Sequence, residues 1–180
     1  MNLNLPEIYN AATTFVDENI TQGRGGQVAI YYQDQKITYQ EVFEKVNRTG
    51  NALKDLGIEI EHRVLVILPD SPEFAYSFFG AIKVGAVAVP TNPWMFAKDY
   101  EYLINDSRAR AIIVHESTLP EIEKIWDNTP FLKHVIVVGT PKGKALSYEG
   151  LIAKASDRLE APKTFKDDVC FWGYTSGSTG

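Results

Sequence analysis

The alternation of short apolar runs with helical segments limits the fold of this sequence more than any other feature. Runs rich in β-branched and aromatic residues recur at residues 28–32, 63–68, 86–89, 111–115, 134–138 and 168–174. Several of them are apolar almost throughout, which is typical of strands whose two faces are both buried. We therefore expect a sheet that is covered on both sides.

The segments between these runs carry the start and stop signals of helices. Thr38 and Glu41 have the spacing of a capping box, in which a hydroxyl and a carboxylate satisfy free N–H groups, and Gly57 is expected to end this helix. The apolar residues of the segment share one helical face; they are Val42, Val46, Leu53 and Leu56. This face is expected to pack on the sheet.

Later segments repeat these signals. Ser71 and Pro72 are expected to open a helix whose buried stripe is Phe74, Phe78 and Ile82 and which Gly85 ends. A further helix is predicted near residues 99–105. Thr118 with Glu121 forms a second capping box, and Ser147 is expected to cap the last helix.

Strands that alternate with helices of this length predict βαβ units with right-handed crossovers. The fold class is therefore α/β, a mostly parallel sheet flanked by helices, and the connections are short enough for one domain. Residues 28–32 and 36–39 flank a three-residue turn and predict a hairpin that adds an antiparallel element to this sheet.

Composition and charge exclude several classes of protein. Hydrophobic residues make up 44% and charged residues 23%, so neither disorder nor a fibrous repeat is expected. The net charge of -5 and scattered Lys and Arg argue against a nucleic-acid partner. Residues 1–7 lack signal-peptide features, and no apolar run is long enough to span a membrane. The single Cys170 is expected to be a small buried hydrophobe, and a cytoplasmic location is expected.

The strongest indication of a binding site is a run of small residues after the last apolar run. Glycines let the backbone approach a ligand, and backbone N–H groups with hydroxyls suit polyphosphate oxygens. The run lacks the Lys and the glycine spacing of a Walker A loop, and its G-x-x-x-G frame has Thr where a serine hydrolase has Ser. The candidate phosphate-binding residues are Thr175, Ser176, Gly177, Ser178, Thr179 and Gly180.

At these residues the chain resembles the adenylate-forming family of acyl- and aryl-CoA synthetases, whose phosphate loop reads [ST]-S-G-[ST]-T-G. Two earlier motifs are similar as well: I-T-Y-Q-E at residues 37–41, and A-I-K-V-G-A-V-A-V-P-T-N-P at residues 81–93. Within the family the chain is most like benzoate-CoA ligases, through K-D-Y-E-Y at residues 98–102 and F-W-G-Y at residues 171–174. The motif W-M-F at residues 94–96 departs from the smaller residues of that group.

The resemblance implies an enzyme that joins an aromatic carboxylic acid to ATP, releases pyrophosphate, and transfers the acyl group to coenzyme A, with Mg²⁺ sharing the phosphate charge. It also implies that residues 1–180 are the first part of the N-terminal AMP-binding domain. The family's other functional residues have no counterpart here, so no catalytic residue and no metal ligand is assigned. We expect this chain alone to be inactive and to self-associate, which light scattering would test.

Two alternatives stay open. The first alternative to the ligase is a non-catalytic protein that binds a nucleotide or a partner. The second is part of an adenylation domain that loads a carrier protein. Other conspicuous residues receive no site role: His62, His115 and His134 lack metal-ligand spacing, and residues 23–26 are expected to form a plain turn. Trp94 and Phe96 are the aromatic residues expected to be exposed.

Overall fold

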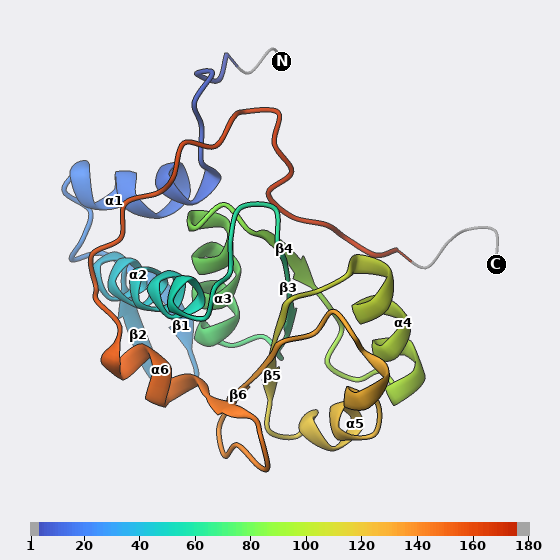
Figure 1. Ribbon diagram of the computed structural model, residues 1–180. Coiled ribbons are helices and arrows are strands. Elements are labelled where there is room, and N and C mark those ends of the chain that lie inside the picture. Colours follow the sequence, from blue (N-terminus) through green and yellow to red (C-terminus); the bar gives the residue numbers. More distant parts are fainter. Residues whose placement is uncertain (1–3, 176–180) are drawn as a thin grey trace.

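The computed structural model describes residues 4–175 (Figure 1). The predicted strands at 28–32, 36–39, 63–68, 86–89, 111–115 and 134–138 are confirmed within a residue or two, whereas a helical segment at residues 13–21 and strand β7 were not predicted. The elements are the π-helical η1 Thr13–Asp17, α1 Glu18–Thr21, β1 Val28–Tyr32, β2 Gln35–Thr38, α2 Tyr39–Asp55, β3 Arg63–Ile67, α3 Pro72–Lys83, β4 Val87–Pro90, α4 Ala97–Ser107, β5 Ala111–His115, α5 Leu119–Glu123, the 3₁₀ turn η2 Trp126–Asn128, β6 His134–Val138, β7 Leu146–Ser147 and α6 Tyr148–Lys154.

The α/β fold class is confirmed. Within the described residues the main sheet has five strands in the order β4-β3-β5-β6-β7, and every neighbouring pair is parallel. The chain moves from β3 to the edge strand β4 and then returns past β3 to β5. Right-handed crossovers in opposite directions put their helices on opposite faces, and α3 and α4 do lie on opposite sides of the sheet (Figure 1).

Alternate residues of the strands fill two separate cores. On the side of α2, α3 and α6 the strands contribute Val64, Val66, Ala88, Ala111, Ile113 and Ile136. On the side of α4 and α5 they contribute Leu65, Ile67, Val87, Val89, Ile112, Val114, Val135 and Val137. Because side chains alternate along a strand, burial of both faces explains why these runs are apolar throughout. Between residues 4 and 175 no helix has the length and apolarity needed to cross a bilayer.

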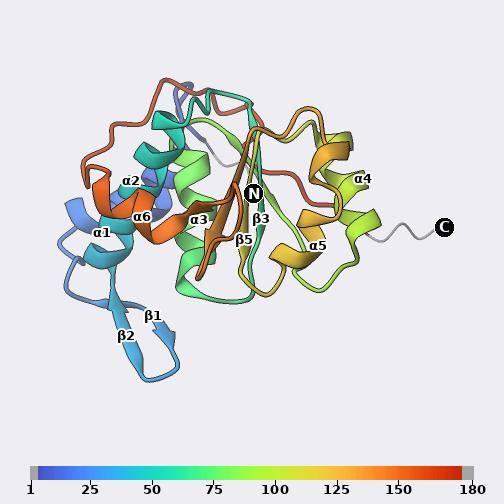
Figure 2. The same cartoon turned by 60° about the horizontal axis from the view of Figure 1, so that its bottom comes forward.

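The hairpin is present, but its expected place in the main sheet is wrong. β1 and β2 pair antiparallel with Tyr31 opposite Lys36, and they form a separate two-stranded sheet. This sheet projects from the body of the protein (Figure 2). The strand β1 has no fully buried residue and Tyr31 is 73% exposed. A strand with so little burial is not suited to a sheet that is covered on both faces.

Two of the four predicted helix caps are confirmed. The Thr38 hydroxyl accepts from the Glu41 N–H at 3.2 Å, while the Glu41 carboxylate accepts from the Thr38 N–H at 2.7 Å. The Ser147 hydroxyl caps α6 by accepting from the Gly150 N–H at 3.1 Å. Gly57 ends α2 with a φ of +79°, as expected of a helix-terminating glycine.

The caps predicted at Ser71 and Thr118 are wrong, because neither side chain accepts a hydrogen bond from its helix. Thr118 has helical backbone angles instead of the extended ones that a capping residue needs. Its hydroxyl donates to the Pro93 carbonyl at 3.3 Å, so it joins α5 to the loop after β4. The stripe on α3 is buried only at Ile82; Phe74 and Phe78 are half-buried.

Helices α2 and α3 approach closely at a pair of glycines. A Cβ atom on Gly80 would lie 3.0 Å from the Cβ atom of Thr49 and 3.2 Å from the backbone nitrogen of Gly50. A side chain on Gly50 would in turn meet the end of Leu159 and the Gly80 carbonyl. Both glycines are therefore required by the distance between the two helices.

The change Gly80→Ala tests this contact. We expect net destabilisation, because overpacking typically costs about 1–3 kcal/mol and the better helix propensity of alanine returns about 1 kcal/mol. Urea unfolding of the two proteins is the measurement. The control is Gly26→Ala, where a Cβ atom meets nothing within 4 Å; equal stability of Gly80→Ala and wild type would contradict the requirement for glycine at this contact.

Candidate functional site

The segment that leads to the candidate phosphate loop lies along the outer edge of β4, but it is not the buried strand that the sequence predicts. The Ala88 N–H donates to the Cys170 carbonyl at 3.1 Å, and the Trp172 N–H donates to the Ala88 carbonyl at 2.9 Å. These bonds form a single parallel bridge between Ala88 and Phe171.

The predicted strand at 168–174 fails because the segment has one β partner within the described residues. Its outer side has no strand beside it there, and Val169 and Phe171 are each 53% exposed. Cys170 is only half-buried, so its predicted full burial is wrong as well. Apolar composition predicted burial on both sides, but composition does not state how many neighbours a segment has.

The direction of the segment brings its end to a hollow at the carboxyl end of β4. Because residues 170–172 run parallel to β4, both continue to the same edge of the sheet. The hollow has a volume of about 520 Å³. Its lining consists of Pro90, Thr91, Asn92, Met95, Asp99, Tyr102, Leu103, Tyr174 and Thr175.

Tyr174 is tied to helix α4. Its hydroxyl donates to Asp106 Oδ2 at 2.6 Å, a bond between residues 68 positions apart. Burial raises the pKa of the Tyr174 hydroxyl, and the bond to the Asp106 carboxylate raises it further. The hydroxyl is therefore protonated at neutral pH, and it fixes the backbone immediately before Thr175.

The loop after β4 is held from beneath by Tyr100, whose side chain is fully buried. The Tyr100 hydroxyl accepts from the Met95 N–H at 3.1 Å and donates to the Asn92 carbonyl at 3.1 Å. Burial is also the main reason that the pKa of Tyr100 is raised. One hydroxyl thus sets the shape of the loop that forms a wall of the hollow. The aromatic residues of this loop, Trp94 and Phe96, are exposed as predicted, by 79% and 73%.

The amino end of α4 is occupied by carboxylates of the protein. The Phe96 N–H donates to Asp99 Oδ2 at 3.3 Å, and the Ala97 N–H donates to Glu121 Oε2 at 3.0 Å. Hydrogen bonds from Lys124 and from the Ala97 N–H lower the pKa of Glu121. These N–H groups are satisfied by the protein itself, so they do not offer a free anion site beside the hollow.

Of the six predicted phosphate-binding residues, Thr175 lies in the lining of the hollow. Ser176, Gly177, Ser178, Thr179 and Gly180 lie outside the described residues. Residues 4–175 also contain no group of three His, Cys, Asp or Glu side chains that could hold a metal ion.

The histidines each have a hydrogen-bonding partner that fits a structural role. His134 Nε2 lies 2.9 Å from the Leu56 carbonyl, His62 Nδ1 accepts from the Glu59 N–H at 3.1 Å, and His115 Nδ1 contacts the Ser117 hydroxyl at 2.8 Å. Residues 23–26 form a turn in which the Gly25 carbonyl accepts from the Gln40 N–H.

Sequence reasoning missed Tyr100, Tyr174 and Asp106. Tyr100 precedes Leu103 and Ile104 by three and four residues, and this spacing places all three on the buried face of α4. A buried tyrosine usually needs a partner for its hydroxyl, so that spacing is a usable signal. The pairing of Tyr174 with Asp106 joins distant segments, and no local pattern predicts it.

Comparison with known proteins identifies the family of this chain. Residues 16–180 match the family described as AMP-binding enzyme. The chain therefore belongs to the AMP-binding enzyme family.

Its curated relatives include two that are named for aromatic acids. It is 39% identical over 179 residues to benzoate–CoA ligase of Thauera aromatica, which covers 99% of this chain and 34% of that protein. It is 37% identical over 172 residues to 4-hydroxybenzoate–CoA/benzoate–CoA ligase of Rhodopseudomonas palustris, which covers 96% of this chain and 32% of that protein. The chain thus spans about a third of the length of these relatives.

Solved structures agree in fold. The crystal structure of the anthranilate CoA ligase AuaEII in complex with anthranoyl-AMP superposes with a TM-score of 0.94 at 38% identity, over 98% of this chain and 34% of that one. A benzoate CoA ligase from Burkholderia xenovorans LB400 gives a TM-score of 0.81 at 29% identity, over 92% and 32%.

The change Tyr100→Phe tests the support beneath the loop. It leaves the Met95 N–H and the Asn92 carbonyl without their partner, so we expect a loss of about 1–3 kcal/mol of stability. Faster hydrogen exchange of the Met95 amide should accompany the loss. The control Tyr102→Phe removes a hydroxyl from a residue that is 63% exposed, and should change neither quantity. Equal behaviour of the two variants would show that the Tyr100 hydroxyl does not hold the loop.

Proposed function

We propose that this chain is part of an ATP-dependent ligase that joins an aromatic carboxylic acid to coenzyme A. The acid's carboxylate attacks the α-phosphate of ATP to give an acyl-adenylate and pyrophosphate, and the thiol of coenzyme A then displaces AMP. In this proposal residues 1–180 are the first part of the N-terminal AMP-binding domain, and the rest of the enzyme supplies the catalytic residues.

The observation that carries the proposal is the similarity to relatives named benzoate–CoA ligases, at 37% and 39% identity over nearly the whole chain. The structural relative at TM-score 0.94 is an anthranilate CoA ligase in complex with anthranoyl-AMP, an aryl-adenylate. The geometry is compatible, because Thr175 stands at the carboxyl end of β4 and ligands of α/β sheets bind at that edge of the strands.

The role proposed for residues 175–180 is to bind the β- and γ-phosphates. The hydroxyls of Thr175, Ser176, Ser178 and Thr179 are suited to donate hydrogen bonds to phosphate oxygens, and Gly177 and Gly180 let the backbone come close to them. Donors fixed before the reaction stabilise the charge that develops on the pyrophosphate leaving group. Mg²⁺ belongs to this proposal as a partner of the phosphates.

The first test is pyrophosphate exchange into ATP by the complete translation product that contains this chain. We expect exchange that depends on benzoate or a substituted benzoate, and formation of the corresponding CoA thioester. The 180-residue chain alone is expected to show no exchange. Ser176→Ala should slow exchange by about 10- to 100-fold, the loss expected for one hydrogen bond to a charged group. Thr21→Val is the control, because its exposed hydroxyl donates only to the Glu18 carbonyl.

The products of the same assay separate the alternatives. An acyl group found on a carrier protein instead of coenzyme A would replace the proposal by an adenylation domain. ATP binding by the complete product without exchange for any acid would favour a non-catalytic nucleotide-binding protein.

A further inference from the structure

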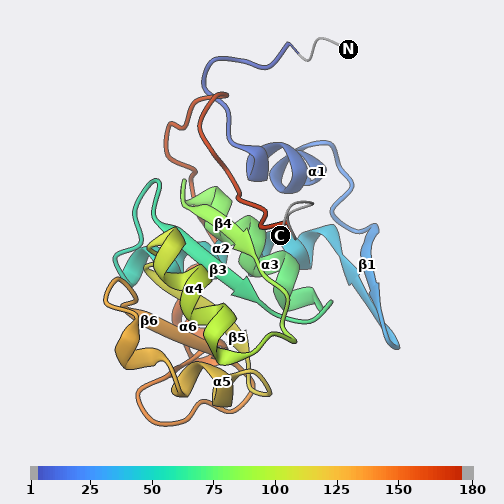
Figure 3. The same ribbon diagram turned by 90° about the vertical axis from the view of Figure 1, so that its right-hand side faces the viewer.

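The chain's N-terminal segment is paired with the segment that leads to residues 170–175. The Tyr9 N–H donates to the Thr164 carbonyl at 2.9 Å, and the Lys166 N–H donates to the Glu7 carbonyl at 3.1 Å, on either side of an antiparallel bridge between Ile8 and Phe165. Figures 1 and 3 show the two segments side by side at one end of the molecule. A contact between residues some 150 positions apart in sequence is therefore made by backbone pairing.

Thr164 adds a side-chain connection to this pairing. Its hydroxyl donates to the Tyr9 carbonyl at 2.6 Å and accepts from Asn10 Nδ2 at 3.4 Å, and the residue is 7% exposed. Asn10 Nδ2 also donates to the Ile82 carbonyl near the end of α3, at 3.0 Å. We call residues 155–175, which lead to the candidate phosphate loop, the loop-bearing segment. Thr164 and Asn10 thus join the N-terminal segment, the loop-bearing segment and the core at one place.

A buried lysine anchors the N-terminal segment to the core. Lys83 of α3 is fully buried, and its Nζ donates to Asp17 Oδ1 at 2.6 Å and to Asn47 Oδ1 at 2.6 Å. Burial lowers the pKa of Lys83, and the bond to Asp17 acts against that shift. A buried ammonium requires such partners, so residue 17 has a fixed place beside α2 and α3.

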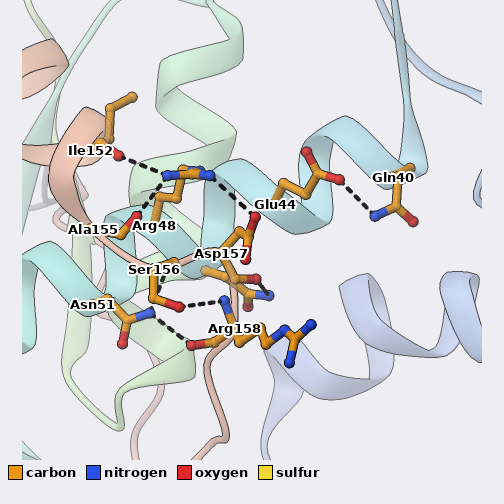
Figure 4. A network of polar contacts seen from close by, with 10 residues as sticks. Gln40, Glu44, Arg48, Asn51, Ile152, Ala155, Ser156, Asp157 and Arg158 are labelled. Atoms are coloured by element: carbon orange, nitrogen blue, oxygen red, sulfur yellow. Dashed lines mark hydrogen bonds and ion pairs between the residues drawn. The ribbon is translucent and has the colours of Figure 1, made fainter.

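Helix α2 holds the start of the loop-bearing segment. Asn47 Nδ2 donates to the Asp157 carbonyl at 2.7 Å, and Arg48 donates to the Ala155 carbonyl at 2.7 Å and to the Asp157 carboxylate at 3.1 Å. Asn51 Nδ2 bonds to the Ser156 and Arg158 carbonyls (Figure 4). The segment is therefore fastened at residues 155–158 and again at residues 164–166.

Beyond residue 166 the segment is held by a small set of contacts: the ring of Phe171 lies 5.8 Å from that of Phe78, Arg63 lies over the Trp172 ring, and Tyr174 bonds to Asp106 of α4. The parallel bridge to β4 supplies two backbone hydrogen bonds, and a small cavity of about 70 Å³ lies beneath, lined in part by Tyr9, Ile82, Thr164 and Cys170. Two hydrogen bonds at an exposed edge are worth only about 1 kcal/mol each. The pairing of residues 170–172 with β4 therefore depends in part on the fastening that precedes them.

We infer that residues 7–10 are a clasp that positions the loop-bearing segment on the edge of β4, with Thr164 as its positioning residue. What the loop binds rests on the proposed function, but the clasp itself does not. Release of the clasp lets residues 168–172 leave β4, which exposes Cys170 and breaks the hydrogen bond from the Trp172 N–H.

Cys170 is the single cysteine of the chain, so its thiol is a specific reporter of this release. The experiment compares the rate at which the folded protein reacts with a small aromatic disulfide reagent in wild type and Thr164→Val. Valine keeps the shape of threonine but loses the hydroxyl. We expect the variant to react about fivefold faster than wild type, the factor for one lost hydrogen bond of about 1 kcal/mol. Hydrogen exchange of the Trp172 amide should also be faster in the variant than in wild type, whereas exchange of the Ile136 amide should be unchanged.

Two further variants decide between positioning and general loss of stability. Thr164→Ser restores the hydroxyl and should return the rate toward that of wild type. Thr129→Val removes a hydroxyl that is equally buried, 3% exposed, and that donates to the Trp126 carbonyl away from the clasp; it should leave the rate unchanged. If Thr164→Val does not fold, Asn10→Ala at a half-buried position tests the clasp by the same rate.

The inference is wrong if the thiol of Cys170 reacts at the same rate in folded Thr164→Val as in wild type. It is also wrong if Thr129→Val raises this rate as much as Thr164→Val does. Neither outcome involves a nucleotide. A failed clasp would therefore leave the proposed ligase activity untouched, and loss of that activity in the exchange assay would leave the clasp untouched.

Discussion

Burial of both faces of the parallel sheet is the constraint on which the rest of the structure depends. Parallel strands joined by helical crossovers need a helical layer on each side, and the reversal of direction at β4 supplies both layers from one short chain. The same requirement brings α2 and α3 together at Gly50 and Gly80 and buries the ammonium of Lys83, with its partners, between the helices and the N-terminal segment. It also leaves β4 at an edge, where residues 170–172 pair.

The candidate site is formed by two segments, the loop after β4 and the segment that carries Thr175, and they are held in different ways. The loop after β4 is fixed by the buried hydroxyl of Tyr100, whereas the segment that carries Thr175 pairs with the sheet through one bridge and with helix α4 through the bond from Tyr174 to Asp106. Its course is fixed earlier, on α2 and on residues 7–10.

How far the sequence predicts this structure depends on the kind of interaction. Strands buried on both faces and helices with local caps, such as Thr38 with Glu41, were predictable because the signal lies within a few residues. The prediction for Thr118 was wrong because the capping pattern does not report the backbone angles of the residue. The prediction for residues 168–174 was wrong because apolar composition does not show that, among the residues that the structure describes, β4 is the one strand beside them. The pairings of Tyr174 with Asp106 and of Tyr9 with Thr164 join distant segments, and a single sequence has no signal for them.

The central claim is that residues 175–180 bind the outer phosphates of ATP. The most direct measurement is calorimetric titration of the complete translation product with ATP and, separately, with AMP, in wild type and in Ser178→Ala. We predict that the variant loses about tenfold in ATP affinity, as for one charge-assisted hydrogen bond, and keeps its affinity for AMP, which lacks these phosphates. Equal losses for both nucleotides, or unchanged binding of ATP, would contradict the claim.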